Sequence, residues 1–364
     1  MIAHLYVGRD LSSWERAGRR GERAGLGPYG VEHLARQDVT LTHWNDPRWT
    51  SAPGIREYRR VERLTRLPLV RTAFSLRSVR RADVTLAMLE QEGYAHALLK
   101  RQGIFPWSAT PLALLTCWLA EAARTASTTK LRTLRFIAQG ADLLIFWSSN
   151  QRQIFQERLD VPDERLFFVP FGTETEFFLP QPRRGGDYIL SVGNDPGRDF
   201  QTFVTAIADI DYPVKIACRP ERLVGIDIPS NLEVLGEVNH LRYRELLYGA
   251  AVVVIPSRPA VVYPTGQTVL LNAMSCQRPT VVTAAAAMAD YIRHGENTWA
   301  VAGEDPGALR NGIEQLLSDG ALAAKLADGG RRDVMRVFNT ETMWASIARR
   351  LRDLVMERDR ASHT

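Results

Sequence analysis

The chain has 364 residues, of which 45% are hydrophobic and 24% charged, with a formal net charge of +5. This composition is typical of a globular protein and excludes a largely disordered chain, and the length predicts two domains because a single core rarely grows beyond about 300 residues. The positive charge comes almost wholly from Arg, since Lys occurs only at Lys100, Lys130, Lys215 and Lys325. Three cysteines (Cys117, Cys218, Cys276) lie in apolar segments and match neither a zinc knuckle nor a disulfide framework, which indicates a reducing compartment.

The first half of the chain predicts alternating strands and helices. Apolar runs with the character of strands cover 2–7, 39–43, 83–88, 112–118 and 142–148, and helical patterns separate several of them. A segment of different character, 55–81, carries nine Arg against two Glu. Such a basic amphipathic segment could lie on an anionic membrane surface, or its alkyl stems could cover the core as a solvated helix face.

The second half predicts the same alternation more clearly. Strands at 188–193, 214–218, 232–235, 251–256 and 280–282 alternate with helices at 200–210, 241–248 and 268–276, and an amphipathic helical tail follows. Two Pro and two Gly mark a linker at 179–188. We therefore predict an α/β protein of two doubly wound, Rossmann-like domains: a first domain over 1–180, a second domain over 181–340, and a terminal helix over 341–364 that packs on the first domain.

No apolar run reaches the length of a membrane span, and the start of the chain lacks the basic region of a signal peptide. We therefore expect a cytoplasmic protein, with the segment 55–81 as the candidate for peripheral membrane contact.

The stretch "YPTGQTVLLNAMSCQRPTVVTAAA" (263–286) suggests a function. It follows the strand "AVVVIPS" (251–257) and reads as a glycine-containing loop, a buried helix and a further strand. This layout places a helix N-terminus at the edge of a parallel sheet, where free N–H groups and the helix dipole attract an anion. A diphosphate group is the anion that we predict.

The neighbouring motifs resemble a known family. "YILSVGNDPGRDFQTFVTAI" (188–207), "TGQTVLLNAM" (265–274) and "RPTVVT" (278–283) occur in the order found in the donor-binding half of GT-B glycosyltransferases of retaining family 4, in a branch with S/T-G-Q in place of E-G-F-G. In the first half, "GLGPYGVEHLARQDVTLTH" (25–43) and "RLFFVPFGTETEFFLP" (165–180) are also similar. The resemblance implies a retaining glycosyltransferase with the GT-B fold, which uses a nucleotide sugar, most often a UDP-sugar, and no metal.

The resemblance assigns roles residue by residue. Arg198 matches the basic residue that neutralises the leaving diphosphate and is the predicted catalytic residue, while Asn272 stands where a Glu accepts ribose hydrogen bonds. The remaining predicted donor-binding residues are Gly193, Asn194, Arg219, Val238, Thr265, Gly266, Gln267 and Thr268. Without the family pattern, Arg198 could be a surface residue, Asn272 a surface amide and Gly266 a simple turn glycine.

Several positions depart from the family. Asn194 replaces an Arg, the first Glu of the E-x7-E pattern has no counterpart, and Cys117 and Trp118 stand where many members place a catalytic His. Retaining transfer can still proceed, because the departing diphosphate oxygen can take the acceptor's proton.

The acceptor is less constrained by the sequence. Tyr29, Gly30, Glu92 and His96 are the predicted acceptor-side residues, with His33 and His43 as weaker candidates that could equally be structural. A small molecule, a lipid-linked sugar and a glycan all fit. An inactive, nucleotide-binding GT-B-like protein is the alternative function, and a nucleic-acid-binding role has no motif to support it.

Overall fold

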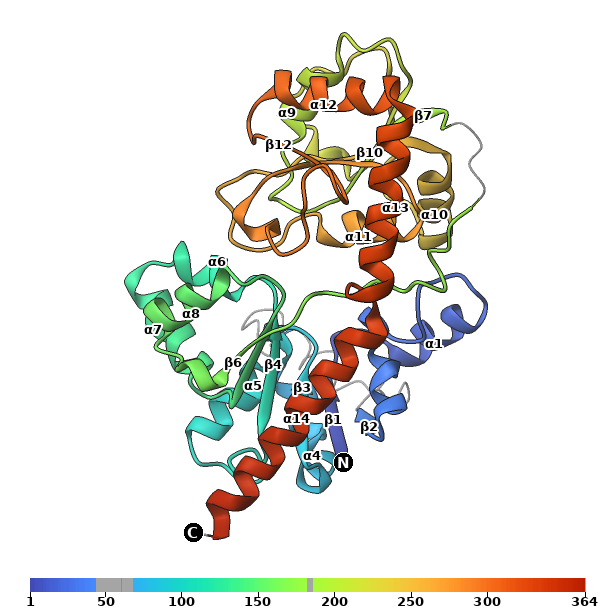
Figure 1. Ribbon diagram of the computed structural model, residues 1–364. Helices are drawn as coiled ribbons and strands as arrows, with labels where there is room; N and C mark the ends of the chain where they lie inside the picture. Colours follow the sequence, from blue (N-terminus) through green and yellow to red (C-terminus); the bar gives the residue numbers. More distant parts are fainter. Residues whose placement is uncertain (44–59, 61–67, 182–185, 364) are drawn as a thin grey trace. The chain divides into compact units, whose positions relative to one another are not determined.

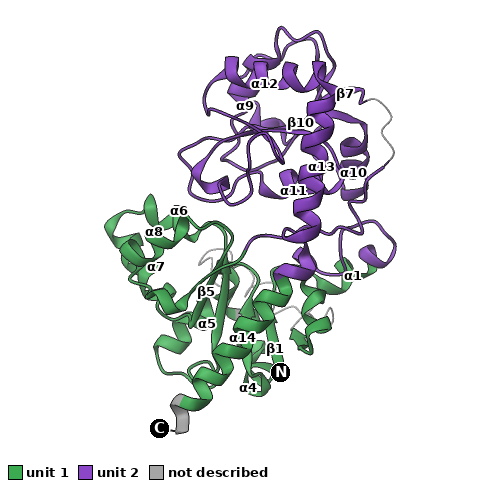
Figure 2. Cartoon of the chain, in the orientation of Figure 1, with its two compact units in different colours: residues 1–16, 31–169, 344–364 green, residues 17–30, 170–343 purple. Residues whose placement is uncertain are grey.

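The computed structural model describes residues 1–43, 60, 68–181 and 186–363 and contains two compact units (Figures 1 and 2). Unit 1 comprises residues 1–16, 31–169 and 344–364, and unit 2 comprises 17–30 and 170–343. The division therefore falls before Pro170, about ten residues ahead of the predicted domain boundary at 180, and residues 17–30 belong with the second unit. Residues 55–59 and 61–67 of the predicted segment 55–81, and residues 182–185 of the predicted linker, lie outside the described residues.

Unit 1 is built on a parallel sheet in the order β2-β1-β3-β4-β5-β6. Its strands are β1 (Ile2–Tyr6), β2 (Thr40–His43), β3 (Val84–Ala87), β4 (Leu112–Thr116), β5 (Leu143–Phe146) and β6 (Leu166–Phe168). Every residue of β3, β4 and β5 is buried, as expected for parallel strands that are covered on both faces. The sequence predicted five of these strands, and the short β6 was missed.

Helical segments connect these strands. They are α1 (Leu11–Arg19), the 3₁₀ segment η1 (Pro28–Gln37), α3 (Leu69–Phe74), α4 (Leu76–Arg81), α5 (Glu90–Arg101), α6 (Leu119–Arg124), α7 (Thr128–Ala138), α8 (Gln151–Leu159) and η3 (Asp163–Arg165). The last helix of the chain, α14 (Thr340–His363), contributes its residues from Trp344 onward to unit 1.

Unit 2 contains the second parallel sheet, in the order β12-β11-β10-β7-β8-β9. The strands are β7 (Tyr188–Val192), β8 (Val214–Ala217), β9 (Leu232–Val234), β10 (Ala250–Ile255), β11 (Thr280–Thr283) and β12 (Trp299–Val301). Counted within the unit, this is the strand order 3-2-1-4-5-6 of a Rossmann sheet, with its switch point between β7 and β10. The predicted fold class, two parallel-sheet Rossmann-like units, is confirmed.

The helices of unit 2 pack around an apolar core. They are α9 (Phe200–Ile207), η4 (Pro220–Arg222), α10 (His240–Gly249), α11 (Gln267–Ser275), η5 (Ala286–Met288), α12 (Pro306–Ser318) and α13 (Gly320–Arg336). Phe203, Ile207, Val252 and Val254 are among the fully buried residues of this core. It joins α9 and α12 to the sheet and keeps the strand ends in place.

The helices of unit 2 differ in whether a side chain caps their first turn. Asp199, Asn239, Asp305 and Asp319 each cap a following helix by accepting a hydrogen bond from a backbone N–H of its first turn. Helix α11 instead has Gly266 as its N-cap residue, whose φ of 81° lies in the left-handed region and which supplies no side-chain cap. The first-turn N–H groups of α11 are therefore not occupied by a capping side chain.

Candidate anion-binding site

The candidate site lies where two loops leave the centre of the unit 2 sheet. Gly193 to Arg198 follow β7, and Ser257 to Gly266 follow β10, the strand that pairs directly with β7. Both loops therefore start at the carboxyl ends of the two strands that flank the switch point. In open α/β sheets this position is the one at which ligands bind.

Arg198 lies at the centre of this arrangement and is only 4% exposed. A Cβ added to Gly193 would approach Arg198 Nε to 2.7 Å, and one added to Gly266 would approach Nη1 to 2.9 Å. The guanidinium group thus fits between two backbone segments that only glycine leaves open. The predicted proximity of Arg198 to the start of α11 is what the structure shows.

The guanidinium group has few partners. Its Nη2 donates to the carbonyl of Val192, whereas Nε and Nη1 are buried and find no acceptor among the residues that the structure describes. Burial lowers the pKa of Arg198 to about 10, and the negative charge of Asp195 opposes part of this shift. The site therefore holds a desolvated positive charge whose hydrogen-bonding capacity is largely unused.

Asp195 organises the two loops but does not pair with the arginine. Its Oδ1 accepts hydrogen bonds from the N–H of Gly197 (2.7 Å), the hydroxyl of Tyr263 (2.7 Å) and the hydroxyl of Thr265 (3.0 Å). These bonds tie the loop after β7 to the loop after β10. The sequence analysis did not select Asp195 or Tyr263, although the Asn-Asp-Pro-Gly turn pattern marked the position of Asp195.

The predicted residues at the start of α11 divide by exposure. Thr265 and Gln267 are 1% and 5% exposed, and the Thr265 hydroxyl is bound to Asp195. Thr268 is exposed and Gly266 is half-buried. The N–H of Gln267 donates to the Pro264 carbonyl at 3.3 Å, so the backbone N–H groups of Thr268 and Val269, rather than the buried side chains, are the groups that can meet an anion.

A second predicted group lies at the ends of β7 and β8. Asn194 donates to Glu237 (3.0 Å) and accepts from the N–H of Arg219 (2.6 Å), while the Arg219 guanidinium pairs with Glu237 at 2.8 Å. Val238, next in the chain, is half-buried. The Arg219 and Glu237 side chains are more than half exposed, so this cluster is accessible from solvent.

Asn272, predicted to stand where a Glu accepts ribose hydrogen bonds, is buried and bonded to its neighbours. It is 4% exposed, its Oδ1 accepts from the Thr173 hydroxyl, and its Nδ2 donates to the Tyr243 hydroxyl at 3.3 Å. Both ends of the amide are therefore used within unit 2. Its proposed contact with a ribose stays a prediction.

His96 is a correction to the acceptor-side prediction. It is fully buried in unit 1; its Nδ1 lies 3.3 Å from the Tyr6 hydroxyl and its Nε2 lies 3.2 Å from the Trp107 carbonyl oxygen. Burial lowers the pKa of His96 to about 3, so the ring is neutral. We therefore assign His96 to the core of unit 1, because no surface of the ring is available to an acceptor.

The other first-domain predictions also have local partners. Glu92 forms an ion pair with Arg71, and both side chains are about one-fifth exposed. Tyr29 and Gly30 belong to unit 2, where Tyr29 packs edge-on against Phe171 and both residues have left-handed backbone conformations. Of the weaker candidates, His33 is buried and His43 is exposed.

Sequence analysis also missed a buried carboxylate in unit 1. Glu90, 2% exposed, accepts from the N–H groups of Cys117 (3.2 Å) and Trp118 (2.9 Å), where the loop after β4 begins. Gln151 binds the Cys117 carbonyl at 2.9 Å. The loop that carries Cys117 and Trp118 is therefore held from two sides, at the carboxyl edge of the unit 1 sheet.

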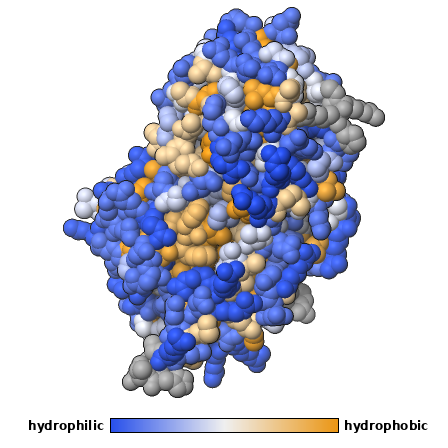
Figure 3. Space-filling view, in the orientation of Figure 1, coloured by the Kyte–Doolittle hydropathy of each residue, from blue (hydrophilic) through white to orange (hydrophobic). Residues whose placement is uncertain are grey.

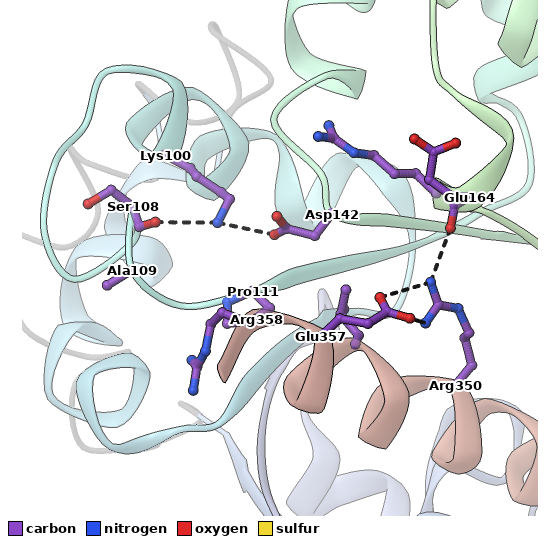
Figure 4. Close-up of a pocket in the computed structure, with 11 residues that line it drawn as sticks. Lys100, Ser108, Ala109, Pro111, Asp142, Glu164, Arg350, Glu357 and Arg358 are labelled. Atoms are coloured by element: carbon purple, nitrogen blue, oxygen red, sulfur yellow. Dashed lines mark hydrogen bonds and ion pairs between the residues drawn. The ribbon is translucent and has the colours of Figure 1, made fainter. Parts of the chain in front are cut away.

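A cavity of about 540 Å³ lies at the opposite, amino edge of that sheet (Figure 4). The close-up shows Lys100 pointing to Asp142 (3.1 Å), and Arg350 pointing to Glu357 (3.0 Å) and to the Glu164 carbonyl (3.1 Å). Its principal charges neutralise one another. This cavity differs from the Arg198 site, where the buried charge forms no ion pair with a carboxylate in the described part of the chain.

The sequence of unit 2 is similar to that of known glycosyltransferases. The family model described as "Glycosyl transferases group 1" matches residues 188–319, the greater part of unit 2. Over 115 residues the chain is 30% identical to "Uncharacterized glycosyltransferase MJ1607" of Methanocaldococcus jannaschii, a match that covers 32% of this chain and 27% of that protein. The chain thus spans about a quarter of the curated relative it matches.

Solved structures resemble the chain over nearly its whole length. Sucrose-phosphate synthase from Thermosynechococcus elongatus superposes with a TM-score of 0.73 at 18% identity, covering 98% of this chain and 99% of that one. Anabaena Alr3699/HepE, solved in complex with UDP and glucose, superposes with a TM-score of 0.68 at 17% identity, covering 96% and 98%. At these identities the likeness shows the fold, which is the GT-B arrangement of two Rossmann-like domains.

Proposed function

We propose that this protein is a group 1 glycosyltransferase that moves a sugar from a nucleotide-activated donor to an acceptor hydroxyl. Three observations support the proposal: the family match over 188–319, the GT-B fold, and the buried, largely unpartnered guanidinium of Arg198 beside the start of α11. The last observation carries it, because it assigns a ligand chemistry to a particular position. A diphosphate group supplies the acceptor oxygens that Nε and Nη1 lack.

The proposed mechanism uses this charge as the reaction proceeds. When the bond between the sugar's anomeric carbon and the diphosphate breaks, negative charge builds up on the leaving oxygen. Arg198 and the first-turn N–H groups of α11 then stabilise that charge in a site with little water, where electrostatic stabilisation is strongest. The acceptor oxygen bonds to the anomeric carbon, and its proton passes to the departing diphosphate.

We further propose that transfer proceeds with retention and without a metal, as in the family 4 pattern that the motifs resemble. The proton route above needs no separate base, and the positive charge that a metal would supply elsewhere is present in Arg198. UDP is the nucleotide we propose, since Anabaena Alr3699/HepE was solved with UDP and with UDP-glucose. The exposed cluster of Asn194, Arg219 and Glu237 is the proposed contact region for the base or ribose.

Calorimetric titration with UDP, GDP, ADP and TDP tests the donor site directly. We expect one nucleotide to bind, with and without EDTA, and Arg198→Ala to weaken it by about 10²-fold, the scale for losing a charge-assisted contact. Arg242→Ala is the matched control, because Arg242 is exposed on α10 in the same unit. If a folded protein binds none of the four, the proposal is wrong.

A donor-hydrolysis assay then separates the enzyme from a protein that only binds nucleotide. We expect slow release of nucleotide from the matching nucleotide sugar. Arg198→Ala should slow this release by raising its activation barrier by about 2–4 kcal/mol. Nucleotide binding with neither hydrolysis nor transfer to any acceptor would instead favour the inactive GT-B-like alternative.

A further inference from the structure

The loop after β4 carries an exposed tryptophan at the carboxyl edge of the unit 1 sheet. Trp118 is 39% exposed, although Thr116, two residues earlier at the end of β4, is fully buried. In the described loops that follow β3, β4 and β5, Trp118 is the one exposed large apolar side chain, since Met88 and Trp147 are buried. Its indole N–H makes no hydrogen bond, and its ring no aromatic contact, with any residue that the structure describes. Part of the indole is therefore open to a ligand from solution.

The backbone that carries this indole is fixed by buried groups. The carboxylate of Glu90 accepts from the N–H groups of Cys117 and Trp118, and Gln151 donates to the Cys117 carbonyl. Both Glu90 and Gln151 are buried. Burial raises the pKa of Glu90, while the N–H groups from which it accepts oppose part of this shift. A carboxylate is costly to bury, so its use to hold one loop indicates that the position of this loop matters.

The neighbouring loops are held at the same edge of the sheet. Glu92 lies two residues after Glu90 in the first turn of α5, and a Cβ added to Gly8, in the loop after β1, would meet Glu92 Oε1. The first turn of α5 therefore contacts the loops after β1 and β4, and the start of α8 contacts the loop after β4. Trp118 thus lies on a preorganised edge, which is the support that precise positioning of a ligand requires.

A hydrogen-bonding group lies beside the indole. Gln151 donates to the Cys117 carbonyl at 2.9 Å, and β4 and β5 pair directly. Asn150 and Trp118 are the chain neighbours of these two residues and therefore lie on adjacent loops. The Oδ1 of Asn150 accepts from the Ser148 hydroxyl at 2.6 Å, whereas its Nδ2 makes no hydrogen bond to a described residue. The surface thus combines a flat apolar ring with a partly exposed amide donor.

We propose that Trp118 and Asn150 form a carbohydrate-binding subsite of unit 1, in which a pyranose ring stacks on the indole. A pyranose has an apolar face of C–H groups and a rim of hydroxyls, so a flat ring with a hydrogen-bond donor beside it matches both parts of the sugar. This inference rests on the proposed function in one respect: the sugar bound by Trp118 is the acceptor of the transfer. Trp118 then selects acceptors that contain a pyranose ring.

Other occupants fit this surface less well. A protein interface surrounds its aromatic anchors with a further apolar area, and Met88 and Trp147 in the adjoining loops are buried. On the face drawn in Figure 3, the surface over the helices that Figure 1 labels α6, α7 and α8 is mostly hydrophilic. A purely aromatic compound would use the indole but would leave the amide of Asn150 without a partner.

Fluorine NMR of the full chain labelled with fluorotryptophan tests the subsite. The chain contains eight Trp, and the Trp118 resonance is identified by its absence from Trp118→Phe. The probes are the methyl glycosides of glucose, galactose, mannose and N-acetylglucosamine, together with maltotriose and chitotriose. We expect at least one of these sugars to shift the Trp118 resonance to saturation.

Variants measure what each group contributes. Saturation-transfer spectra of the bound sugar should show affinity about tenfold lower in Trp118→Leu, which removes the flat ring, and largely retained in Trp118→Phe, which keeps one. Asn150→Asp keeps the acceptor of the Ser148 hydroxyl but removes the amide donor, and it should also weaken the sugar severalfold. This second variant tests the subsite even if Trp118→Leu fails to fold.

Phe105→Leu is the matched control. Phe105 is 61% exposed in the loop between α5 and β4, so this change removes an exposed aromatic ring from the opposite, amino edge of the same sheet. It should leave sugar affinity as in the parent protein. Nucleotide titration of the parent reports on unit 2 separately: nucleotide binding without sugar binding refutes only the subsite, and sugar binding without nucleotide binding refutes only the proposed donor site.

Each other outcome overturns the proposal. If no probe sugar shifts the Trp118 resonance, or if Phe105→Leu weakens the sugar as much as Trp118→Leu does, the indole is not a sugar platform. A shift with phenol or indole but with none of the sugars would assign Trp118 to an aromatic ligand. A resonance that moves with protein concentration and not with sugar would assign it to a contact between copies of the chain.

Discussion

Replacement of Arg198 by Met tests two consequences of a buried charge that binds a ligand: the contact with the ligand, and the free-energy cost of burying the charge. Methionine has a similar length, no charge and no hydrogen-bond requirement, so it removes the ligand contact and also the cost of burying a guanidinium group. Within the described ranges of the chain, that group has a single acceptor, the Val192 carbonyl. We therefore expect Arg198→Met to stabilise unit 2 while it abolishes nucleotide binding.

The size of the effect follows from the pKa. Burial lowers the pKa of Arg198 to about 10. A pKa lowered from about 12.5 to about 10 corresponds to roughly 3 kcal/mol of destabilisation of the charged folded state, at any pH well below 10. Loss of the hydrogen bond to the Val192 carbonyl costs about 1 kcal/mol. The net gain is about 2 kcal/mol, or roughly 4–8 °C in the melting temperature of a domain of this size.

Differential scanning calorimetry of the full chain measures both effects. The unit 2 transition is identified by its upward shift when the nucleotide found by titration is added to the parent protein. In Arg198→Met this transition should start higher and no longer respond to nucleotide, whereas Arg242→Met should change neither property. A ligand-free Arg198→Met that melts lower than the parent would refute the reasoning, because the charge would then be satisfied within the protein.

Three further predictions concern positions with clear local causes. Gly266→Ala should lower nucleotide affinity by at least about tenfold, because the added Cβ meets Arg198, whereas Gly236→Ala, with φ of 69° and open space around it, should cost only about 1 kcal/mol of stability. Burial lowers the pKa of His4 to about 4, with His43 contributing, and the pKa of His96 to about 3, with Lys100 contributing. The free energy of unfolding of unit 1 is therefore at its full value above about pH 6.5 and should fall by roughly 2 kcal/mol per histidine by pH 5. Thermal melts at each pH measure this fall. A drop of that size that persists in a variant lacking both histidines would contradict this assignment. Glu90→Ala should destabilise unit 1 by about 2 kcal/mol in urea unfolding, since two partly buried N–H groups lose their acceptor, and a change below about 0.5 kcal/mol would count against that role.

Much of the fold could be predicted from the sequence because most strands appear in it as apolar runs bounded by turn residues. All five predicted strands of each unit are present, with ends within two residues in most cases. The strands that were missed, β6 and β12, have three residues each, too few for a period to be visible. The grouping of residues 17–30 with unit 2 could not be predicted, since it depends on contacts distant in sequence rather than on local pattern.

For the site, prediction succeeded where backbone geometry requires particular residue types. The glycine before α11 and the arginine after β7 could be located because only glycine suits the left-handed start of the helix and because Arg198 follows a marked turn. Exposure was harder to predict. A histidine on a helix can face the core or solvent, and His96 faces the core; an amide in the family's ribose position can face the ligand or bind its neighbours, and Asn272 binds Thr173 and Tyr243.

The strongest indication of a ligand is a difference in how buried charges are satisfied. Asp333 is 3% exposed and binds Arg293 and Asn297, Asp199 accepts two hydrogen bonds from Thr202, and Glu90 is held by backbone N–H groups. Each of these carboxylates has its partners within its own unit. Arg198 is buried to the same degree, but its one acceptor among the described residues is a carbonyl. The carboxylate of Asp195, whose charge acts on Arg198, instead accepts from loop hydroxyls and an N–H. Among the residues that the structure describes, Arg198 has two buried guanidinium nitrogens without an acceptor, whereas Arg158 and Arg244 have one each, and this difference at the switch point supports the proposed anion from solution.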